Sequence, residues 1–144
     1  MSVERNKTIL RRFFEELFNE GNLSVAGEIV AEDYVNHDPA PGEQPGLEGL
    51  KAFITGMRTS FPDGHFGIED QIAEGDKAVT RWTFRGTHKA DFAGIPATGK
   101  QVTFSAINIH RVVDGRIQDA WLEWDTLGFM QQLGVIPAPG QADQ

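Results

Sequence analysis

Residues Gln101–Trp124, QVTFSAINIHRVVDGRIQDAWLEW, decide the fold class of this chain. The pair Asp114-Gly115 is a strong signal for a tight hairpin, because such turns need residues that accept positive φ angles. Strand-forming residues flank the pair on both sides. The stretch therefore predicts two antiparallel strands, 101–113 and 116–124.

The 101–113 strand carries apolar side chains on both of its faces. Val102, Phe104 and Ala106 share one parity, and Ile107, Ile109 and Val113 share the other. A strand that is apolar on both faces needs cover on both. The helices of the chain are expected to cover one face, so we predict that the outer sheet face forms a homodimer.

The segments around this hairpin give a pattern of helices followed by strands. Apolar residues recur at helical spacing in two long segments, Val3–Asn19 and Leu47–Ser60. The other predicted elements are a short helix, Val25–Val30, capped by Ser24; strands 66–72 and Lys77–Thr87; loops Asn36–Gly46 and Lys89–Lys100; and a final helix, Thr126–Leu133, that Gly134 ends. Helices segregated from an antiparallel run of strands predict an α+β fold.

Length and charge limit the classes of function. The 144 residues suit one domain, predicted over residues 1–136, followed by a Pro- and Gly-rich tail over 137–144. The absence of cysteine excludes disulfides and thiolate chemistry. The net charge of −8 argues against a nucleic-acid partner, since such a partner needs a basic surface. No apolar run spans a bilayer and no signal-peptide core opens the chain, so we expect a cytoplasmic protein without a membrane partner.

Two patterns carry weaker signals of chemistry. Gly94–Lys100, GIPATGK, has the spacing of a phosphate-binding loop, but it joins two strands instead of opening a helix, and Gln101 follows where Ser or Thr would hold magnesium. We therefore expect a surface loop there. The four histidines lack the spacing of a metal motif, so no metal site is predicted. They are His37, His65, His88 and His110.

Asn108 and His110 are the most informative polar residues of the hairpin. They share a parity within a strand whose neighbours are apolar, and asparagine is a poor strand former. Either they form a satisfied polar pair in the core, or they point into a cavity between sheet and helices. Asp125 also has two interpretations, as the N-cap of the final helix or as a pocket carboxylate that acts as a general base.

Several short motifs follow one another along nearly the whole chain. They are DYVNHDP (33–39), GLEGLKAF (46–53), FPD (61–63), RWTFRGTH (81–88), GIPATGK (94–100), VDGRI (113–117) and DTLGFMQQLG (125–134). As an ordered set they make the chain resemble the SnoaL-like polyketide cyclase (ester cyclase) family of the nuclear transport factor 2-like superfamily. The resemblance implies a cone-shaped, curved antiparallel sheet, packed by N-terminal helices around an apolar pocket, and dimers through the outer sheet face.

The resemblance also implies a mechanism from which this chain departs. The family's cyclases close a ring by intramolecular aldol addition without a cofactor, with an aspartate on the last strand as the base. Counted from the Asp-Gly hairpin, Leu122 stands at that position, and Asn108 stands where a pocket histidine is expected. Asn36 matches a pocket asparagine. A leucine cannot accept a proton, so the family's acid–base pair is absent.

These observations lead to a hypothesis about the site. We expect a pocket for a small, flat, apolar molecule. Its predicted lining is Phe13, Leu17, Tyr34, Asn36, Phe53, Met57, Trp82, Phe84, Asn108, Leu122 and Trp124. If the protein is an enzyme of the cyclase, isomerase or hydrolase type, we predict acid–base catalysis without a cofactor. His110 would be the base, and the amides of Asn36 and Asn108 would donate hydrogen bonds to an oxyanion. Asp125 or His37 would orient or exchange the proton.

Two other classes of function stay open at this point. One is a binding module with the same pocket and no chemistry, and the other is a dimeric scaffold whose pocket has collapsed. An epoxide hydrolase is disfavoured, because it would need an inward Asp–Arg–Asp set. Arg81 and Arg85 have the strand parity opposite to that of Trp82 and Phe84.

Overall fold

A single five-stranded sheet organises the fold in the computed structural model, which describes residues 2–137. The strands lie in the order β1-β5-β4-β3-β2. Their bounds are β1 Val30–Asn36, β2 His65–Glu74, β3 Lys77–Thr87, β4 Gln101–Val113 and β5 Arg116–Trp124. Strands β2 to β5 are antiparallel neighbours, and β1 adds to β5 in parallel. Apart from Pro137, the predicted tail lies outside the described residues.

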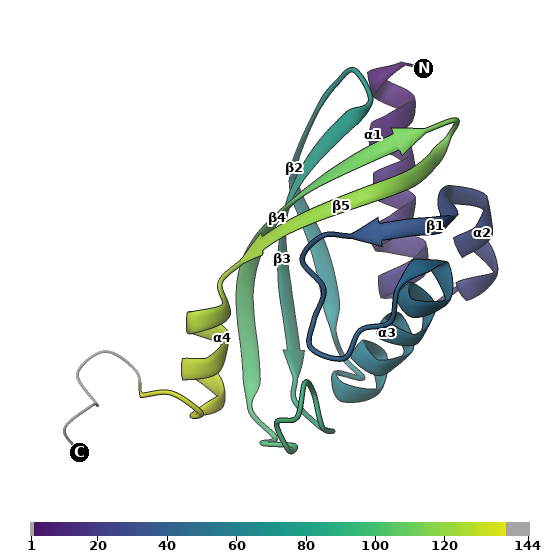
Figure 1. Ribbon diagram of the computed structural model, residues 1–144. Coiled ribbons are helices and arrows are strands. Elements are labelled where there is room, and N and C mark those ends of the chain that lie inside the picture. Colours follow the sequence, from purple (N-terminus) through teal and green to yellow (C-terminus); the bar gives the residue numbers. More distant parts are fainter. Residues whose placement is uncertain (1, 138–144) are drawn as a thin grey trace.

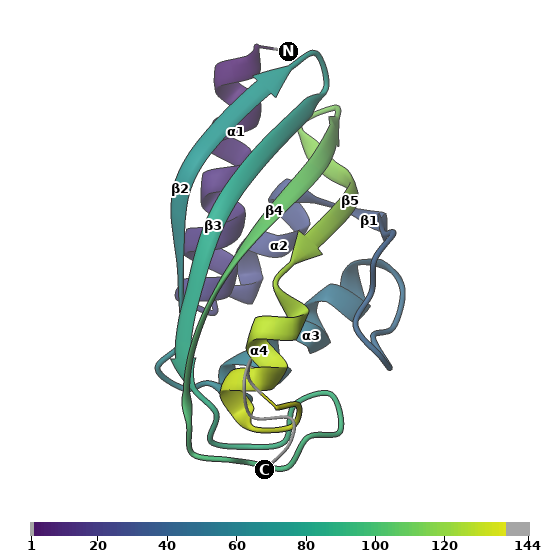
Figure 2. The same cartoon turned by 90° about the vertical axis from the view of Figure 1, so that its left-hand side faces the viewer.

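The helices lie mainly on the concave face of this strongly curved sheet (Figures 1 and 2). They are α1 Val3–Arg12, a π-helix Phe13–Asn19, a 3₁₀ turn Leu23–Val25, α2 Ala26–Ile29, α3 Gly46–Ser60 and α4 Thr126–Leu133. Helix α1 packs on β2 and β3, α3 packs on β1, and α4 packs on β4. The predicted α+β fold, with a curved sheet packed by N-terminal helices, is confirmed.

The first helix changes its winding halfway. Ser2 caps α1 by accepting a hydrogen bond from the Arg5 N–H, and the chain then widens into a π-helix at Phe13. Such widened turns are rare and recur at functional sites. All six apolar residues that the helical spacing singles out are buried: Ile9, Leu10, Phe13, Phe14, Leu17 and Phe18. The predicted single helix over 3–19 is therefore right in its buried face and wrong in its uniform winding.

The first strand was missed by the sequence prediction, which expected four strands and a helix that continued to Val30. The helix ends at Ile29, and the chain turns into β1 at Val30. A break in register between Val30 and Val35 removes the alternation of buried and exposed residues that identifies a strand. The sheet is therefore mixed, with one parallel edge strand.

Two further local expectations are corrected. Ser24 does not cap a helix; its hydroxyl donates to the side chain of Asn22, 2.6 Å away. In β2, the predicted alternation from Phe66 to Ile72 is interrupted by a bulge between Ile68 and Asp70. The bulge turns the Ile72 side chain to the outside, where it is 62% exposed.

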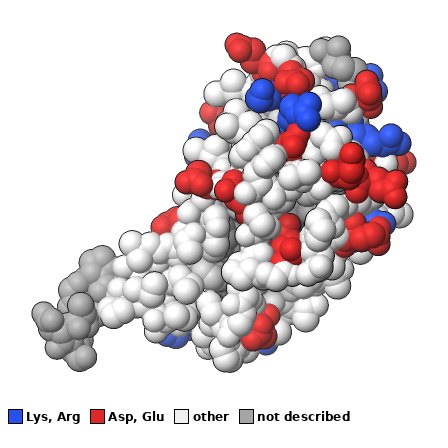
Figure 3. All heavy atoms as spheres, in the orientation of Figure 1, with Lys and Arg blue, Asp and Glu red and all other residues white. Residues whose placement is uncertain are grey.

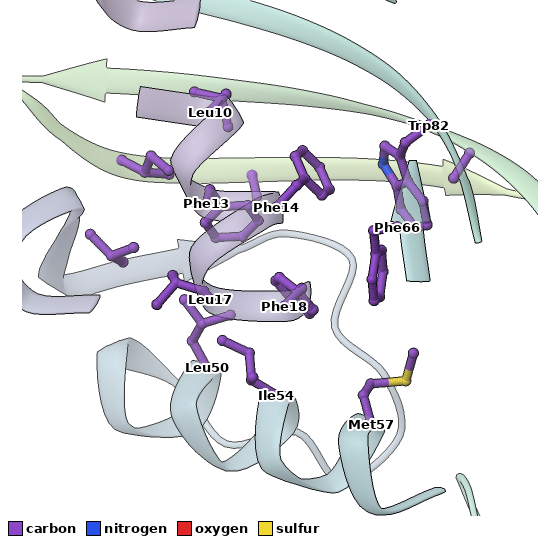
Figure 4. Packing of buried hydrophobic residues seen from close by; sticks show 14 of the residues in the cluster. Leu10, Phe13, Phe14, Leu17, Phe18, Leu50, Ile54, Met57, Phe66 and Trp82 are labelled. Atoms are coloured by element: carbon purple, nitrogen blue, oxygen red, sulfur yellow. The ribbon is translucent and has the colours of Figure 1, made fainter. Parts of the chain in front are cut away.

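The hydrophobic core fills the concave side of the sheet. Figure 4 shows side chains of the first helical segment, such as Leu17 and Phe18, meeting Leu50 and Ile54 of α3. On the sheet side, the Phe66 ring lies 5.1 Å from the Trp82 ring, and Phe66 is also 4.8 Å from Phe18. Among residues 2–137, no helix is long and apolar enough to cross a membrane.

The outer face of the sheet carries the second apolar set of β4. Val102, Phe104 and Ala106 are buried under the helices, whereas Ile107 and Ile109 are 46% and 38% exposed. With the exposed Ile72 of β2, they give the outer face an apolar surface in the single chain. The predicted two-faced character of the 101–113 strand is confirmed.

Candidate functional site

A cavity of about 430 Å³ lies between the concave sheet face, the helices and the loops at one end of the cone. This is within the usual size range of small-molecule sites. Aromatic and aliphatic side chains form nearly all of its wall. The aromatic members are Phe13, Phe14, Phe18, Tyr34, Phe53, Phe61, Phe66, Trp82, Phe92, Phe104, Trp124 and Phe129.

Most of the predicted lining residues do border this cavity. Nine of the eleven are in its wall: Phe13, Tyr34, Asn36, Phe53, Met57, Trp82, Asn108, Leu122 and Trp124. Leu17 and Phe84 are instead buried in the core, with 0% and 1% exposure, and do not border it. Leu17 sits between helices, and Phe84 packs against Phe61 and Phe66.

Sequence reasoning missed the walls that the loops and the last helix supply. Phe92 and Ile95 come from the loop between β3 and β4, and Phe129 and Met130 come from α4. The GIPATGK segment belongs to this surface loop, as predicted, and no helix follows it. Phe129 and Leu133 stand four residues apart in α4, so the helical spacing of these two apolar residues was the signal in the sequence for a buried face on this helix.

His110 borders the closed part of the cavity. Its ring centroid lies 5.0 Å from that of Phe13 and 6.2 Å from that of Phe14. Nδ1 is buried and has no hydrogen-bond partner among the described residues. Burial lowers the pKa of His110 to about 3, because a charged imidazolium loses its hydration among these rings. The imidazole is therefore neutral at physiological pH.

Asn108 is held by two hydrogen bonds. Its side-chain oxygen accepts from the indole N–H of Trp82 at 2.6 Å, and its amide nitrogen donates to the backbone oxygen of Trp121 at 3.2 Å. Both interpretations of this residue thus hold in part, since the amide is satisfied and also borders the cavity. One amide N–H remains for a bound molecule.

The other two predicted catalytic residues do not border the cavity. Asp125 is exposed and caps α4, where its carboxylate accepts from the Gly128 N–H at 2.9 Å. His37 stacks on Trp121 and contacts the Asp119 carboxylate, at 3.0 Å from Nε2. Burial alone would raise the pKa of Asp119, but hydrogen bonds from His37 and Arg111 outweigh it and lower that pKa. Asp119 and Trp121 have the outward parity of β5, so His37 lies on the other side of the sheet from the cavity.

Two carboxylates border the cavity from the loop after β1, and neither was among the predicted catalytic residues. Asp38 accepts a hydrogen bond from the Leu122 N–H at 2.8 Å, which ties the loop to the edge of β5. Glu43 accepts from the Asn36 amide at 3.1 Å and from the Ala40 N–H at 3.2 Å. Asn36 also accepts from the Asp38 N–H, so it organises both acidic residues. Asn36 and Asp38 are two residues apart, which is the spacing of an Asx-type turn. This spacing is the sequence signal that could have indicated the turn of the loop.

Helix α3 holds this loop by close backbone packing. A Cβ atom at Gly49 would overlap the backbone oxygen of Gln44, so only glycine fits there. A second cavity, of about 380 Å³, lies between the same loop, α3 and residues 91–93. Glu43 borders both cavities.

The titratable groups of the cavity are few. Tyr34 is 4% exposed, and its hydroxyl has no hydrogen-bond partner among residues 2–137. Burial, followed by the charges of Glu43 and Asp119, raises the pKa of Tyr34, so the phenol stays protonated. Arg81 and Arg85 are both exposed and do not border the cavity. Within the described part of the chain, no three His, Asp or Glu side chains are grouped as metal ligands.

Charged side chains are distributed unevenly over the molecule. Figure 3 shows acidic and basic groups gathered over the upper part of this face, around β1 and α2, while the surface over α4 is mostly uncharged. Among the described residues, the charged side chains that border the cavity are those of Asp38 and Glu43, with no Lys or Arg. The cavity is therefore apolar over most of its surface, and its acidic side chains lie on the loop after β1.

Comparison with known proteins identifies relatives across the whole fold. The model of the SnoaL-like polyketide cyclase family matches residues 8–133. Aklanonic acid methyl ester cyclase DauD of Streptomyces sp. (strain C5) is 30% identical over 132 residues, which cover 87% of this chain and 80% of the relative. Nogalonic acid methyl ester cyclase of Streptomyces nogalater is 30% identical over 122 residues, covering 81% and 89%. The structure of TsrD from Streptomyces laurentii has a TM-score of 0.86 at 29% identity, covering 94% of this chain and 99% of that chain.

Proposed function

This chain belongs to the SnoaL-like polyketide cyclase family, and we propose that its cavity binds a flat, largely apolar carbonyl compound and catalyses cofactor-free proton transfer on it. The single observation that carries the proposal is the aromatic chamber of about 430 Å³. Its rings offer stacking faces on several sides, which suits a planar ligand with few polar groups. The few polar groups on the wall, among them Asn108, would orient that ligand.

The relatives suggest the first compounds to test. The names of two of them refer to methyl esters of aklanonic and nogalonic acid. The chemical class that we propose as substrate for this chain is an aromatic polyketide ester with an acidic C–H bond. The acidic, cysteine-free sequence favours a cytoplasmic location for this chemistry.

The proposed chemistry begins with removal of a carbon-bound proton next to a carbonyl group. The electron pair of the broken C–H bond moves to the carbonyl oxygen and forms an enolate. The enolate carbon then attacks a second carbonyl of the same molecule to close a ring, and the new alkoxide takes up a proton. Hydrogen bonds to the two oxygens would lower both barriers, which supports roles for the free N–H of Asn108 and for neutral His110.

His110 fits the role of a hydrogen-bonding group better than that of the base. A base whose conjugate acid has a pKa of about 3 has little affinity for a carbon-bound proton at neutral pH. Leu122 has no proton-accepting group at all. The proposal therefore requires a base elsewhere on the cavity wall.

The experiment that tests this function combines binding and turnover. The purified protein is mixed with aklanonic acid methyl ester, and binding is followed by quenching of the tryptophan fluorescence, since Trp82 and Trp124 border the cavity. Product formation is followed by NMR, because ring closure leaves the mass unchanged and a mass spectrum alone would not reveal it. Binding with conversion supports the proposal, and the absence of binding for this ester and for a panel of aromatic ketones contradicts it.

A binding module without catalysis is the second candidate, and one observation favours it. Leu122 occupies the position at which the family resemblance places the base, so the usual proton acceptor is missing. This candidate predicts saturable binding with neither conversion of the ester nor exchange of carbon-bound protons.

We also propose that the chain forms a homodimer through the outer sheet face. The exposed Ile72, Ile107 and Ile109 of that face support this, because large apolar side chains grouped on one surface are typical of an interface. Dimerisation would cover these residues and leave the cavity, on the opposite face, open to its ligand.

A further inference from the structure

Within residues 2–137, four titratable side chains border the cavity, and their environments leave few choices for a base. They are Tyr34, Asp38, Glu43 and His110. Burial keeps the Tyr34 phenol protonated and the His110 imidazole weakly basic. Carboxylates are ionised at neutral pH in ordinary environments. The proton acceptor must then come from the loop after β1, which carries both carboxylates, and not from the sheet.

Glu43 is the better placed of the two. Asp38 is exposed and uses its carboxylate to hold the Leu122 N–H at the edge of β5. Glu43 is half-buried, and its side chain borders both cavities. Hydrogen bonds from Asn36 and from the Ala40 N–H fix the orientation of its carboxylate.

A proton donor borders the same cavity as this carboxylate. Tyr34 and Glu43 both border this cavity, and the negative charge of Glu43 adds to burial in raising the pKa of Tyr34. The Tyr34 ring is buried and borders the cavity, while its hydroxyl has no partner among the described residues. An O–H group of this kind is available to donate a hydrogen bond to a bound oxygen.

We propose that Glu43 is the general base of this pocket and that Tyr34 donates the hydrogen bond that stabilises the enolate oxygen. The inference rests on the proposed function and names the residues that perform it. The Glu43 carboxylate takes the proton from the carbon next to the carbonyl. The electron pair moves to the carbonyl oxygen, which the Tyr34 hydroxyl holds, and the protonated Glu43 returns a proton at the end of the cycle.

The test follows hydrogen–deuterium exchange in 2-tetralone, a flat bicyclic ketone with acidic C–H bonds. Exchange in D₂O is measured by NMR with the full-length protein, and affinity is measured by tryptophan fluorescence. In Glu43→Gln we expect exchange to slow by about 10²–10⁴-fold while the Kd for 2-tetralone stays within about threefold of the wild-type value. Tyr34→Phe, which keeps the ring, is expected to slow exchange by roughly tenfold or more.

Two controls separate a chemical role from a structural one. Glu48→Gln removes the same charge from an exposed residue in the first turn of α3 and is expected to leave exchange unchanged. Glu43→Ala is expected to recover exchange as sodium formate is added, because a small carboxylate can occupy the vacated space. A carboxylate that served only to hold the loop would give no recovery that grows with formate concentration.

The outcomes distinguish this inference from the proposed function. Wild-type exchange with no loss in Glu43→Gln, or a larger loss in Asp38→Asn, would overturn the assignment of Glu43 and leave the proposed function standing. Binding without any wild-type exchange would overturn the assignment of a base and favour the binding module. No binding of 2-tetralone or of aklanonic acid methyl ester would overturn the proposed function itself.

Discussion

At the scale of single residues, the polar groups of the pocket are each fixed by one or two partners. Trp82 and Asn108 form a buried pair across β3 and β4, and Asn36 ties Asp38 and Glu43 to the end of β1. Buried polar groups cost free energy when they lack a partner, so these bonds decide which side chains stay available for a ligand. His110 and Tyr34 are the exceptions, since the buried Nδ1 of His110 and the hydroxyl of the buried Tyr34 have no partner among residues 2–137.

The Trp82–Asn108 pair allows a test of stability. Asn108→Ala leaves the indole N–H of Trp82 buried and unpaired, so we expect the free energy of unfolding to fall by about 1–3 kcal/mol. Trp82→Phe removes the donor, and the double variant should lose less than the sum of the two single changes. Urea denaturation measures all three, and strictly additive losses would contradict the account.

The pH dependence of stability tests the environment of His110. Its pKa is about 3 in the folded chain, below the ordinary value near 6.5. Between these two pH values the unfolded chain binds a proton at this residue and the folded chain does not. The protein should therefore lose stability as the pH falls from about 6.5 towards 3, by up to about 1.4 kcal/mol per pH unit from this group. In His110→Phe this part of the slope should disappear.

The control for this measurement is His65→Gln, because His65 is exposed. The free energy of unfolding of this variant should change with pH in the same way as that of the wild type. If the wild type and His110→Phe lose stability with the same slope between pH 6 and pH 4, the folded state does not exclude the proton from His110.

Sequence parity predicted much of the site at this scale. It placed Trp82, Asn108 and Leu122 on the cavity wall, because side chains alternate strictly along a strand. It misplaced Leu17, since helical spacing identifies the buried face of the first helix but does not reveal which apolar residues on that face meet an empty space. It also missed Glu43, whose position depends on how an irregular loop folds back over α3.

At the scale of elements, the loop after β1 and helix α3 form one unit that positions the proposed base. The close approach of Gly49 to the backbone of Gln44 locks the loop against the helix. The strongly periodic elements were predicted well, including α3, β3, β4 and β5, whose bounds agree to within a residue. The π-helix, the bulge in β2 and the strand β1 were not, because tertiary contacts override the local pattern at each of them.

Substitution of glycines in α3 tests this unit. Gly49→Ala should destabilise the fold by about 1–3 kcal/mol, because the new methyl group overlaps the backbone of Gln44 and displaces the loop that carries Glu43. Gly56→Ala is the matched control. It adds the same methyl group to open space on the same helix, and it should stabilise the protein by about 0.5–1 kcal/mol through helix propensity. Thermal unfolding of both variants gives the comparison, and equal effects would contradict the close packing.

The cap of α4 gives a second test at this scale. Asp125→Ala removes the acceptor for the Gly128 N–H and should cost about 0.5–2 kcal/mol of stability. Because Asp125 does not border the cavity, we expect 2-tetralone exchange to proceed at the wild-type rate under conditions where the variant is folded. A loss of exchange without a loss of stability would return Asp125 to the list of candidate bases.

At the scale of the whole molecule, the two faces of the curved sheet have different roles in the account: one borders the cavity and the other is the proposed dimer interface. Its concave face and the helices enclose the cavity, and its outer face exposes Ile72, Ile107 and Ile109. Ile107→Lys should shift the protein from dimer to monomer in sedimentation velocity, because an unpaired charge is costly at the centre of an apolar interface. A wild-type chain that sediments as a monomer would contradict the proposed dimer.

Native mass spectrometry tests the central claim, that this cavity is built for a flat apolar molecule, most directly. The gently purified protein is measured before and after incubation with aklanonic acid methyl ester, beside a variant in which Ala120→Trp fills space at the cavity wall opposite His110. We predict one ligand per chain for the wild type and a lower occupancy for the variant. A wild-type spectrum that stays free of this ester and of every aromatic ketone tested would contradict the account.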